Sequence, residues 1–394
     1  MLCAGPSVKL VLVTADFPPM LGGVATLLGS LARSCCEHCD VFVLAPSMRD
    51  SKVFDARQPY HIIRVPGRSP FLEVRFLKRL LSLDRREGFD IIACASWFPS
   101  GLVGYALHAA RKKPYLVWTY GSEIADDWRT LRRAIKSVLR PLKSVVLEKC
   151  AAIVAISRYT KSLVVSQGVS PDRVFVIPPG VDPGRFSPSG DPQVVSRYRK
   201  GARHVLLTVG RLDPHKGHAN VLRALAGGLH DLGGVRYVIV GSGPEEAALR
   251  TLASTLGVTS KVEFLGDVAD EDLPDVYRAA DIFVMPSGVL PGRLDYVEGF
   301  GISYLEASAC QKPIVAGRSG GVEDAVVDGV TGVLVDPDDV VEIGQAVRGL
   351  VLDPARAMNL GKAGRTRVLS QLSLDHFAEA VIALARSVTR EGHR

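Results

Sequence analysis

Short runs of apolar, largely β-branched residues recur along the chain and alternate with segments in which apolar residues repeat every three or four positions. Runs that are apolar at every position are typical of parallel strands buried on both faces. Their alternation with helical segments predicts βαβ units and parallel sheets. In the first half of the chain the predicted strands are Lys9–Thr14, Val41–Leu44, Ile91–Ala95, Tyr115–Thr119, Ala152–Ile156 and Val174–Ile177.

A stretch rich in proline and glycine, Ile177–Pro192, interrupts the alternation and predicts a linker. The predicted strands then resume at Val205–Val209, Tyr237–Val240, Val262–Phe264, Ile282–Met285, Ile314–Ala316 and Gly332–Val335. We therefore predict an α/β protein with two doubly wound, Rossmann-like domains, residues 1–182 and 183–373. A helical tail in residues 374–394 is expected to pack back on the first domain. Ligands of such folds bind beyond the carboxyl ends of the strands, which predicts a cleft between the domains.

The composition is that of a globular protein, because 47% of the 394 residues are hydrophobic and 23% are charged. No apolar stretch approaches the roughly 18 residues of a membrane-spanning helix. The apolar run near the N-terminus is better explained as a first strand than as a signal peptide. The seven cysteines are odd in number and scattered, so we expect a reducing, cytoplasmic compartment. Cys35, Cys36 and Cys39 could indicate a metal site, but without a second ligand pair we favour the end of a helix.

The full chain has a net charge of +7, and its positive charge is concentrated in the first half. Between Arg64 and Lys143 there are sixteen basic and seven acidic residues, an excess of nine positive charges. Two segments in this region, Phe71–Leu83 and Trp128–Leu147, combine an apolar helical stripe with basic residues and predict peripheral binding to an anionic membrane surface. The alternative is a core-packed helix with a solvated basic face, and Pro141 predicts a kink or break. The basic residues concerned are Arg75, Lys78, Arg79, Arg129, Arg132, Arg133, Lys136, Arg140 and Lys143.

The motif G-R-L-D-P-H-K-G, Gly210–Gly217, directly follows a predicted strand. It places Arg211 and Lys216 at the carboxyl end of that strand. Two fixed cations in a partly dry cleft can stabilise the negative charge that develops on a departing diphosphate. The alternative for the same motif is an exposed loop with solvated charges.

Glycine pairs follow several other predicted strands. Gly241 and Gly243 resemble part of a dinucleotide fingerprint, but Glu246 stands where its third glycine should be. In E-G-F-G-I-S-Y-L-E, Gly301 precedes a helix predicted to begin near Ile302, and a helix N-terminus binds anions. The carboxylates that flank this motif need hydroxyl donors, such as those of a sugar or ribose. They are Glu298 and Glu306, and further glycine pairs that precede helices are Gly320–Gly321 and Gly22–Gly23.

These motifs, in this order along nearly the whole chain, resemble glycosyltransferase family 4. The resemblance implies the GT-B fold of two Rossmann-like domains, a nucleotide-sugar donor linked to GDP or UDP, retention of anomeric configuration, and no metal or other cofactor. It also implies that Arg211 and Lys216 bind the donor diphosphate, that Glu298 holds the sugar hydroxyls and that Glu306 takes the ribose hydroxyls. Further implied donor contacts are Gly22, Gly23, Gly241, Gly243, Phe300, Gly301 and Ile302.

One position departs from the family. Where its members commonly have histidine before glycine, this chain has Tyr120, followed by Gly121 and Glu123. Tyrosine can donate a hydrogen bond but accepts a proton less readily than histidine near neutral pH. Tyr120 and Glu123 are therefore expected near the acceptor without an assigned role. Asp126 and Asp127 are interpreted as first-turn residues of a helix rather than a metal site.

The loop before Glu298 and the helix after it look closest to members that transfer mannose from GDP-mannose to phosphatidylinositol-type lipids. We therefore predict a retaining, metal-independent hexosyltransferase with a lipid-linked or glycan acceptor, peripheral on the cytoplasmic membrane face. The alternatives are a transferase with a soluble acceptor and a non-catalytic sugar-nucleotide-binding protein. A dinucleotide-dependent oxidoreductase is disfavoured by the missing third glycine. No recognition module supports binding to nucleic acid.

Overall fold

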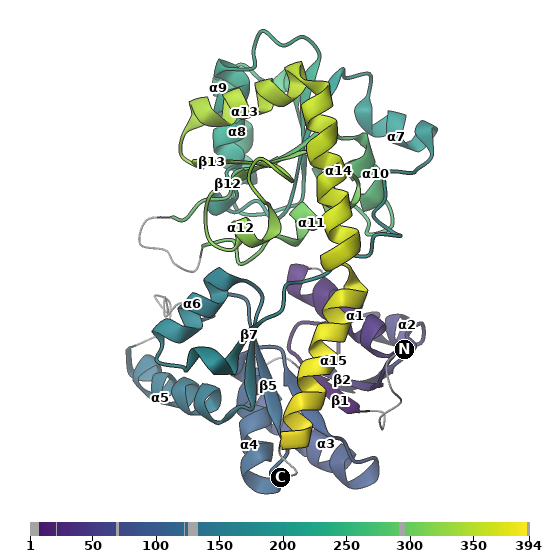
Figure 1. Cartoon of the computed structure of the whole chain (residues 1–394), viewed down its shortest axis with the longest axis vertical. Helices are drawn as coiled ribbons and strands as arrows, with labels where there is room; N and C mark the ends of the chain where they lie inside the picture. The colour runs from purple at the N-terminus through teal and green to yellow at the C-terminus, as the bar shows by residue number, and fades with distance from the viewer. Residues whose placement is uncertain are drawn as a thin grey trace. The chain divides into compact units, whose positions relative to one another are not determined.

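In the computed structural model the chain folds into two compact units (Figure 1). Unit 1 comprises Met1–Pro179 together with Leu374–Arg394, and unit 2 comprises Gly180–Ser373. The structure describes residues 8–20, 22–67, 71–121, 123–124, 133–290 and 296–391, with the backbone alone for 133–140 and 391.

Unit 1 is built on a seven-stranded parallel sheet in the order β3-β2-β1-β4-β5-β6-β7. The six strands predicted in this half of the chain are confirmed. The sequence analysis missed one strand, β3, at the edge of the sheet; its residues H-I-I-R-V are mostly half-buried, so it lacks the continuous apolar run of a buried strand. The strands are β1 (Lys9–Val13), β2 (Asp40–Pro46), β3 (His61–Val65), β4 (Ile91–Cys94), β5 (Tyr115–Thr119), β6 (Ala152–Ala155) and β7 (Val174–Val176).

Helices flank this sheet and bury their apolar faces against it. The buried face of α3 carries Phe76 and Leu80, which are fully buried with Val11, Ile92 and Val117 of the sheet. The C-terminal helix α15 belongs to unit 1, where it packs beside α1 (Figure 1). The helices are α1 (Gly23–Cys35), α2 (Ser51–Asp55), α3 (Leu72–Arg86), α4 (Leu102–Arg111), α5 (Arg133–Lys149), α6 (Arg158–Ser166) and α15 (Leu374–Glu391).

Unit 2 is built on a six-stranded parallel sheet in the order β10-β9-β8-β11-β12-β13, which confirms all six predicted strands. The strands are β8 (His204–Val209), β9 (Val235–Val240), β10 (Val262–Gly266), β11 (Ile282–Met285), β12 (Ile314–Gly317) and β13 (Val333–Val335). The helices are α7 (Pro192–Arg199), α8 (His218–Gly227), α9 (Glu246–Thr255), α10 (Leu273–Ala279), α11 (Ile302–Ala309), α12 (Val322–Ala325), α13 (Val340–Leu352) and α14 (Pro354–Gln371).

The strand order reverses once in each sheet, between β1 and β4 in unit 1 and between β8 and β11 in unit 2. At such a point the loops leave neighbouring strands in opposite directions and open a crevice at the carboxyl ends. The loops after β8 and β11 carry the predicted chemistry of unit 2. The order reversal therefore fixes where the functional residues of that unit gather.

Two features of the second basic segment differ from expectation. Helix α5 continues through Pro141, so of the kink or break expected there, no break occurs. Lys143 is not on a solvated face but is 2% exposed, and its Nζ donates a hydrogen bond to the Ile124 carbonyl at 2.8 Å. The ammonium thus ties α5 to the loop after β5. Arg129, Arg132, Asp126, Asp127 and the side chains of Arg133, Lys136 and Arg140 lie outside the described residues.

The end of α1 explains the cysteine cluster. The helix ends at Cys35 and β2 begins at Asp40, so these cysteines lie in the tight connection that was expected. Cys35 and Cys39 are buried, and burial raises the pKa of the Cys39 thiol to about 11. Within the described part of the chain, no group of three or more acidic, histidine or cysteine side chains could hold a metal ion.

Candidate functional site

The loops after β8 and β9 lie in direct contact, and glycine makes this possible. Gly241 has a φ of 119°, and a Cβ added to it would lie 2.2 Å from the carbonyl oxygen of Gly210. Its own amide donates to the carbonyl of Gly266 at 2.7 Å. Any larger residue at this position would push the loop after β8 aside, and that loop carries Arg211 and Lys216.

Lys216 and Glu298, which are 82 residues apart in the sequence, form the central ion pair of unit 2. Lys216 Nζ lies 2.5 Å from Glu298 Oε2, and the two side chains are only 16% and 12% exposed. Burial acts to raise the pKa of the Glu298 carboxyl, but the Lys216 ammonium and its hydrogen bond outweigh it and lower the pKa. The carboxylate therefore stays charged at neutral pH. Lys216 keeps two further N–H protons for an anion, and Glu298 keeps lone pairs for hydroxyl groups.

The start of α11 supplies backbone donors next to this pair. Gly301 adopts a φ of 91° at the N-cap. Among the described residues, no side chain caps this helix and its first turn contains no acidic residue. An uncapped helix N-terminus with its dipole favours an anion. A hydrogen bond from the Phe300 backbone to the Glu298 carboxylate helps to lower the pKa of this group. Of the predicted residues, Phe300 and Gly301 thus lie beside Glu298, since a Cβ added to Gly301 would be 3.5 Å from Glu298 Cδ. Ile302 is the first residue of α11.

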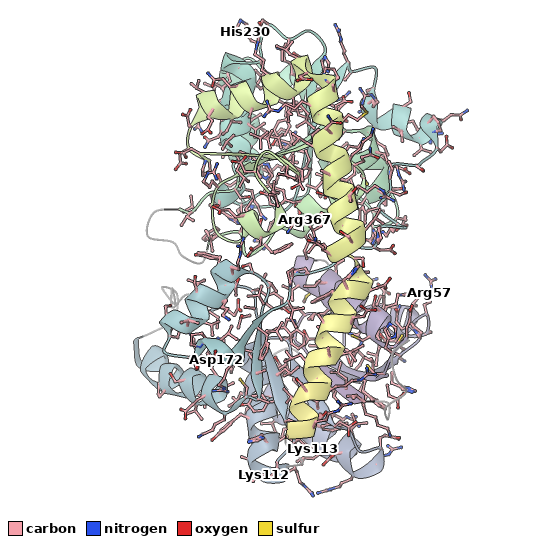
Figure 2. The ribbon with its side chains drawn as sticks, viewed as in Figure 1. Arg57, Lys112, Lys113, Asp172, His230 and Arg367 are labelled. Atoms are coloured by element: carbon pink, nitrogen blue, oxygen red, sulfur yellow. The ribbon has the colours of Figure 1, made fainter. Side chains whose placement is uncertain are left out.

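The loop after β12 is tied to the same place. The Gly321 amide donates to the backbone carbonyl of Glu298 at 2.8 Å. The short helix α12 that follows is held at its C-terminal end by Arg367 of α14, whose guanidinium donates to the carbonyls of Asp324 and Ala325 at 2.6 Å (Figure 2). A cation that binds the last carbonyls of a helix stabilises its end. Sequence reasoning gave no signal for Arg367.

Glu306 lies one turn further along α11, where it meets a residue that the sequence analysis did not single out. The Tyr277 hydroxyl donates to Glu306 Oε2 at 2.6 Å, and Tyr277 is fully buried on α10. Burial raises the pKa of the Glu306 carboxyl, although the Tyr277 hydrogen bond acts in the opposite direction. Tyr277 thereby fixes the direction in which the Glu306 carboxyl points.

Arg211 is not part of the buried pair. Its side chain is 71% exposed, and its Nε lies 3.3 Å from Asp213 Oδ2 in the same loop. Lys216, by contrast, is held by Glu298, which lies in the loop between β11 and α11. The structure therefore pre-positions Lys216 and leaves Arg211 at the surface of the loop, where solvent screens its charge.

A buried polar network lies under the loop that holds Lys216. Thr208 of β8 donates to the carbonyl of Val284 in β11, and its Oγ1 lies 2.8 Å from the Tyr237 hydroxyl of β9. His218, at the start of α8, places its Nδ1 3.4 Å from the same hydroxyl. The network joins three neighbouring strands to the helix directly after Lys216, and the sequence analysis did not foresee it.

We expect His218 to make the stability of unit 2 depend on pH. Burial lowers its pKa from 6.5 to about 4, so the folded protein excludes a proton that the unfolded chain binds. The stabilisation is full above pH 6.5 and is lost progressively as the pH falls from 6.5 to 4, for a total change of about 3 kcal/mol. Urea unfolding of His218→Gln between pH 7 and pH 4.5 should show a smaller loss of stability than the wild type. The exposed His230 (Figure 2) provides a matched control, His230→Gln, which should follow the wild type.

In unit 1 the loop after β5 holds the residues that depart from the family pattern. Glu123 Oε1 accepts a hydrogen bond from the Tyr120 amide at 2.5 Å, and Trp97 Nε1 donates to the Glu123 carbonyl at 3.1 Å. Burial raises the pKa of the Glu123 carboxyl against the lowering effect of these backbone amides. The Glu123 carboxylate is therefore engaged in holding its own loop.

Tyr120 is half-buried, but its hydroxyl oxygen is inaccessible and accepts or donates no hydrogen bond among the described residues. Burial raises the pKa of this phenol well above 10, and the nearby Glu123 and Asp16 carboxyls raise it further. The hydroxyl thus remains protonated and is a donor. Asp16, from the loop after β1, is a neighbour of Tyr120 that sequence reasoning missed.

The other predicted residues of unit 1 lie at the start of α1. Gly22 is its N-cap, with a φ of 149°, and Gly23 is its first residue. A Cβ added to either glycine would meet no atom within 4 Å. Neighbouring atoms therefore do not require glycine at either position, but the φ of Gly22 does favour glycine there.

Two family models together match most of the chain. Residues 21–185 match the family model described as Glycosyltransferase Family 4, and residues 196–367 match Glycosyl transferases group 1. A GDP-mannose-dependent alpha-(1-6)-phosphatidylinositol monomannoside mannosyltransferase of Mycolicibacterium smegmatis is 35% identical over 86% of this chain and 88% of its own. A GDP-mannose-dependent monoacylated alpha-(1-6)-phosphatidylinositol monomannoside mannosyltransferase of Corynebacterium glutamicum is 32% identical over 86% of this chain and 87% of its own.

The solved structures show the same fold. Anabaena HepE in complex with UDP superimposes with a TM-score of 0.79 at 18% identity, over 96% of this chain and 100% of that chain. A likeness at this level of identity shows the fold alone. It confirms the predicted GT-B architecture, in which each of the two domains is a doubly wound parallel sheet.

Proposed function

Since the chain belongs to glycosyltransferase family 4 and is a glycosyltransferase, we propose that it transfers mannose from GDP-mannose to a lipid of the phosphatidylinositol mannoside class. The mannose and GDP are supported by the relatives, which carry these substrates in their names over most of the chain. The buried Lys216–Glu298 pair is the observation that carries the donor assignment. A pre-positioned cation beside a charged carboxylate matches a diphosphate next to a sugar.

In the proposed reaction unit 2 holds the donor. The Lys216 ammonium and the amides at the start of α11 stabilise the charge that grows on the diphosphate as its bond to the sugar breaks. Glu298, kept ionised by Lys216, accepts hydrogen bonds from the sugar hydroxyls. Arg211 swings from Asp213 to the diphosphate when the donor binds, because its side chain is exposed and able to move. Gly241 and Gly243 let the loop backbone approach the nucleotide.

Replacement of Tyr277 by phenylalanine tests the part that Glu306 plays with the ribose. The variant removes only the hydroxyl that donates to Glu306 Oε2. A lost hydrogen bond to a charged partner is worth about 1.5 kcal/mol or somewhat more. We therefore expect the KM for the nucleotide sugar to rise about tenfold while kcat stays within a factor of two. An unchanged KM would show that Glu306 does not contact the ribose.

Unit 1 is proposed to receive the acceptor, near Tyr120 and Asp16. The acceptor oxygen bonds to the anomeric carbon on the face from which the diphosphate leaves, so configuration is retained. The acceptor proton passes to the departing phosphate oxygen. No enzyme base and no metal are needed for this step, and the raised pKa of the buried Tyr120 phenol keeps it protonated, so it cannot serve as a base.

Membrane association is proposed through the outer face of α3. Phe71 and Val74 are large apolar residues that are 65% and 49% exposed, and the exposed Arg75 and Lys78 lie beside them. An apolar tip with neighbouring cations is the pattern of a helix that lies on an anionic bilayer. None of the helices within the described residues is long and apolar enough to cross a bilayer.

A transfer assay with the purified protein tests the proposal. GDP-mannose and UDP-glucose are supplied in turn with EDTA, either with vesicles that contain a phosphatidylinositol monomannoside or with soluble inositol and mannosides. Labelled mannose in the lipid fraction, with the anomeric configuration of the donor, is the expected result. Transfer to the soluble acceptors alone would favour a soluble-sugar transferase. Donor binding without any transfer would favour a non-catalytic sugar-nucleotide-binding protein.

A further inference from the structure

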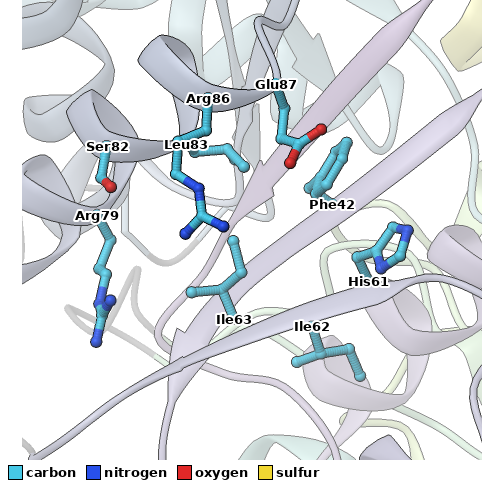
Figure 3. Close-up of a pocket in the computed structure, with 9 residues that line it drawn as sticks. All are labelled: Phe42, His61, Ile62, Ile63, Arg79, Ser82, Leu83, Arg86 and Glu87. Carbon is cyan, nitrogen blue, oxygen red and sulfur yellow. The ribbon is translucent and has the colours of Figure 1, made fainter.

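A pocket of about 330 Å³ opens in unit 1 between the edge of the sheet and the second half of α3 (Figure 3). Its apolar wall is formed by Phe42 of β2, Ile62 and Ile63 of β3 and Leu83 of α3. The polar side is formed by Arg79, Ser82, Arg86, Glu87 and His61. None of the residues assigned above to the donor or the acceptor lines it.

The pocket lies near the amino ends of the strands, whereas the predicted acceptor residues follow the carboxyl end of β5. His61 begins β3 and pairs in register with Phe42, the third residue of β2. The strands are parallel, so these residues mark the amino ends of the strands. Tyr120 follows β5 at its carboxyl end. A ligand in the pocket would therefore be a molecule other than the one bound beside Tyr120.

Three polar residues of α3 face the pocket as a stripe. Arg79, Ser82 and Arg86 are spaced i, i+3 and i+7, which places them on one face of the helix. Figure 3 shows the Arg86 guanidinium reaching over the sheet toward Ile63. The chain thus supplies two guanidinium groups and a hydroxyl above an apolar floor.

Neither guanidinium is neutralised within the described part of the chain. Arg64 of the same unit, by contrast, pairs with Asp55 at 2.7 Å. Arg79 and Arg86 make no hydrogen bond or ion pair with a described residue, and Glu87, although it lines the pocket, points toward Phe42 in Figure 3. Arg86 lies in the last turn of α3, where it also offsets the helix dipole. Arg79 lies two turns earlier, where the helix dipole has little effect. The dipole therefore does not explain why arginine stands at both positions.

We propose that this pocket binds the phosphate of an anionic phospholipid other than the acceptor. Guanidinium groups are suited to bidentate hydrogen bonds with phosphate oxygens, and Ser82 offers a further donor. The apolar wall of Phe42, Ile63 and Leu83 suits the glycerol and upper acyl carbons next to such a phosphate. His61, stacked on Phe42 with ring centroids 5.1 Å apart, closes one side of the pocket. The inference rests on the proposed membrane association and adds a specific lipid site to it.

Vesicle co-sedimentation without any nucleotide sugar tests the site. The full-length protein is compared with the double variant Arg79→Gln/Arg86→Gln and with a charge-matched control, Arg85→Gln/Arg111→Gln, which removes two exposed arginines of unit 1 outside the pocket. Vesicles contain phosphatidylcholine with or without phosphatidylglycerol, an anionic phospholipid outside the proposed acceptor class. We expect the pocket variant to bind the anionic vesicles about tenfold or more weakly than the wild type, and the control to lose less than threefold.

The outcomes separate this inference from the function proposed above. Equal losses in the two variants would show general surface attraction and overturn the pocket. Soluble glycerol 3-phosphate is added as a competitor at a concentration equal to that of the accessible anionic lipid. If it displaces the protein from the vesicles, the pocket binds a soluble phosphate ester and the lipid assignment is overturned. Transfer to a water-soluble acceptor is measured in parallel and is expected to be unchanged in the pocket variant. A loss of that transfer would instead place the pocket in the acceptor site and overturn the inference.

Discussion

Replacement of Lys216 by alanine is expected to lower kcat/KM for the nucleotide sugar by a factor of about 10² to 10³. Of the two cations assigned to the diphosphate, Lys216 is the more firmly positioned, with its Nζ 2.5 Å from Glu298 Oε2. Its removal takes away charge stabilisation from the departing diphosphate and leaves the Glu298 carboxylate buried without its cation. The pKa of this carboxyl should then rise, because the ammonium that lowers it is gone. Initial rates at pH 7 with saturating acceptor measure the effect.

Two further variants show whether the loss belongs to the site. Lys362→Ala removes an exposed lysine from α14 of the same unit and should leave the rate unchanged. The double variant Lys216→Ala/Glu298→Gln should be little worse than Lys216→Ala, because the effects of residues that act as a unit are not additive. A transfer rate for Lys216→Ala within threefold of the wild type would remove Lys216 from the mechanism. Thermal unfolding is recorded alongside, since a buried carboxylate that loses its partner also costs stability.

The strands were predictable because burial on both faces leaves a plain mark in the sequence. Val11, Ile92 and Val117 lie in runs that are apolar at every position, and few structures besides a buried parallel strand produce such short runs. Edge strand β3 leaves no such mark, since only Val65 of its five residues is fully buried. Glycines that precede helices also leave a mark in the local sequence. The helix predicted to begin near Ile302 does begin at that residue.

Contacts between distant parts of the chain could not be predicted from the sequence. Nothing local to Tyr277 indicates that its hydroxyl meets Glu306, which lies 29 residues away on another helix. The basic pattern around Lys143 indicated a solvated face, yet the lysine stem is long enough to carry its ammonium to the buried carbonyl of Ile124. The pairing of Lys216 with Glu298 likewise depends on β8 and β11 being neighbours, which only the strand order decides. The motifs thus identified the residues, and the topology decided which of them touch.

Replacement of Gly301 by alanine is expected to impair both folding and donor binding. The backbone has a φ of 91°, and an added Cβ would lie 2.3 Å from the ring of Tyr304, which is fully buried. The ring cannot move aside easily, because its hydroxyl donates to the Met285 carbonyl at 2.7 Å. Strain of this kind costs about 1–3 kcal/mol. The start of α11 must then shift, and the amides that are proposed to bind the diphosphate shift with it.

A second glycine with a positive φ serves as the control, because it separates the effect of the steric contact with Tyr304 from the effect of the backbone conformation. Gly257 has a φ of 68°, but a Cβ there would meet nothing within 4 Å. Gly257→Ala should therefore show only the modest cost of a left-handed alanine, about 1 kcal/mol, with an unchanged KM for the donor. Gly301→Ala should lower the unfolding temperature further and raise that KM at least tenfold. If the two variants bind GDP equally well in a calorimetric titration, the start of α11 is not the diphosphate site, and the anion must be held by the loop of Lys216 alone.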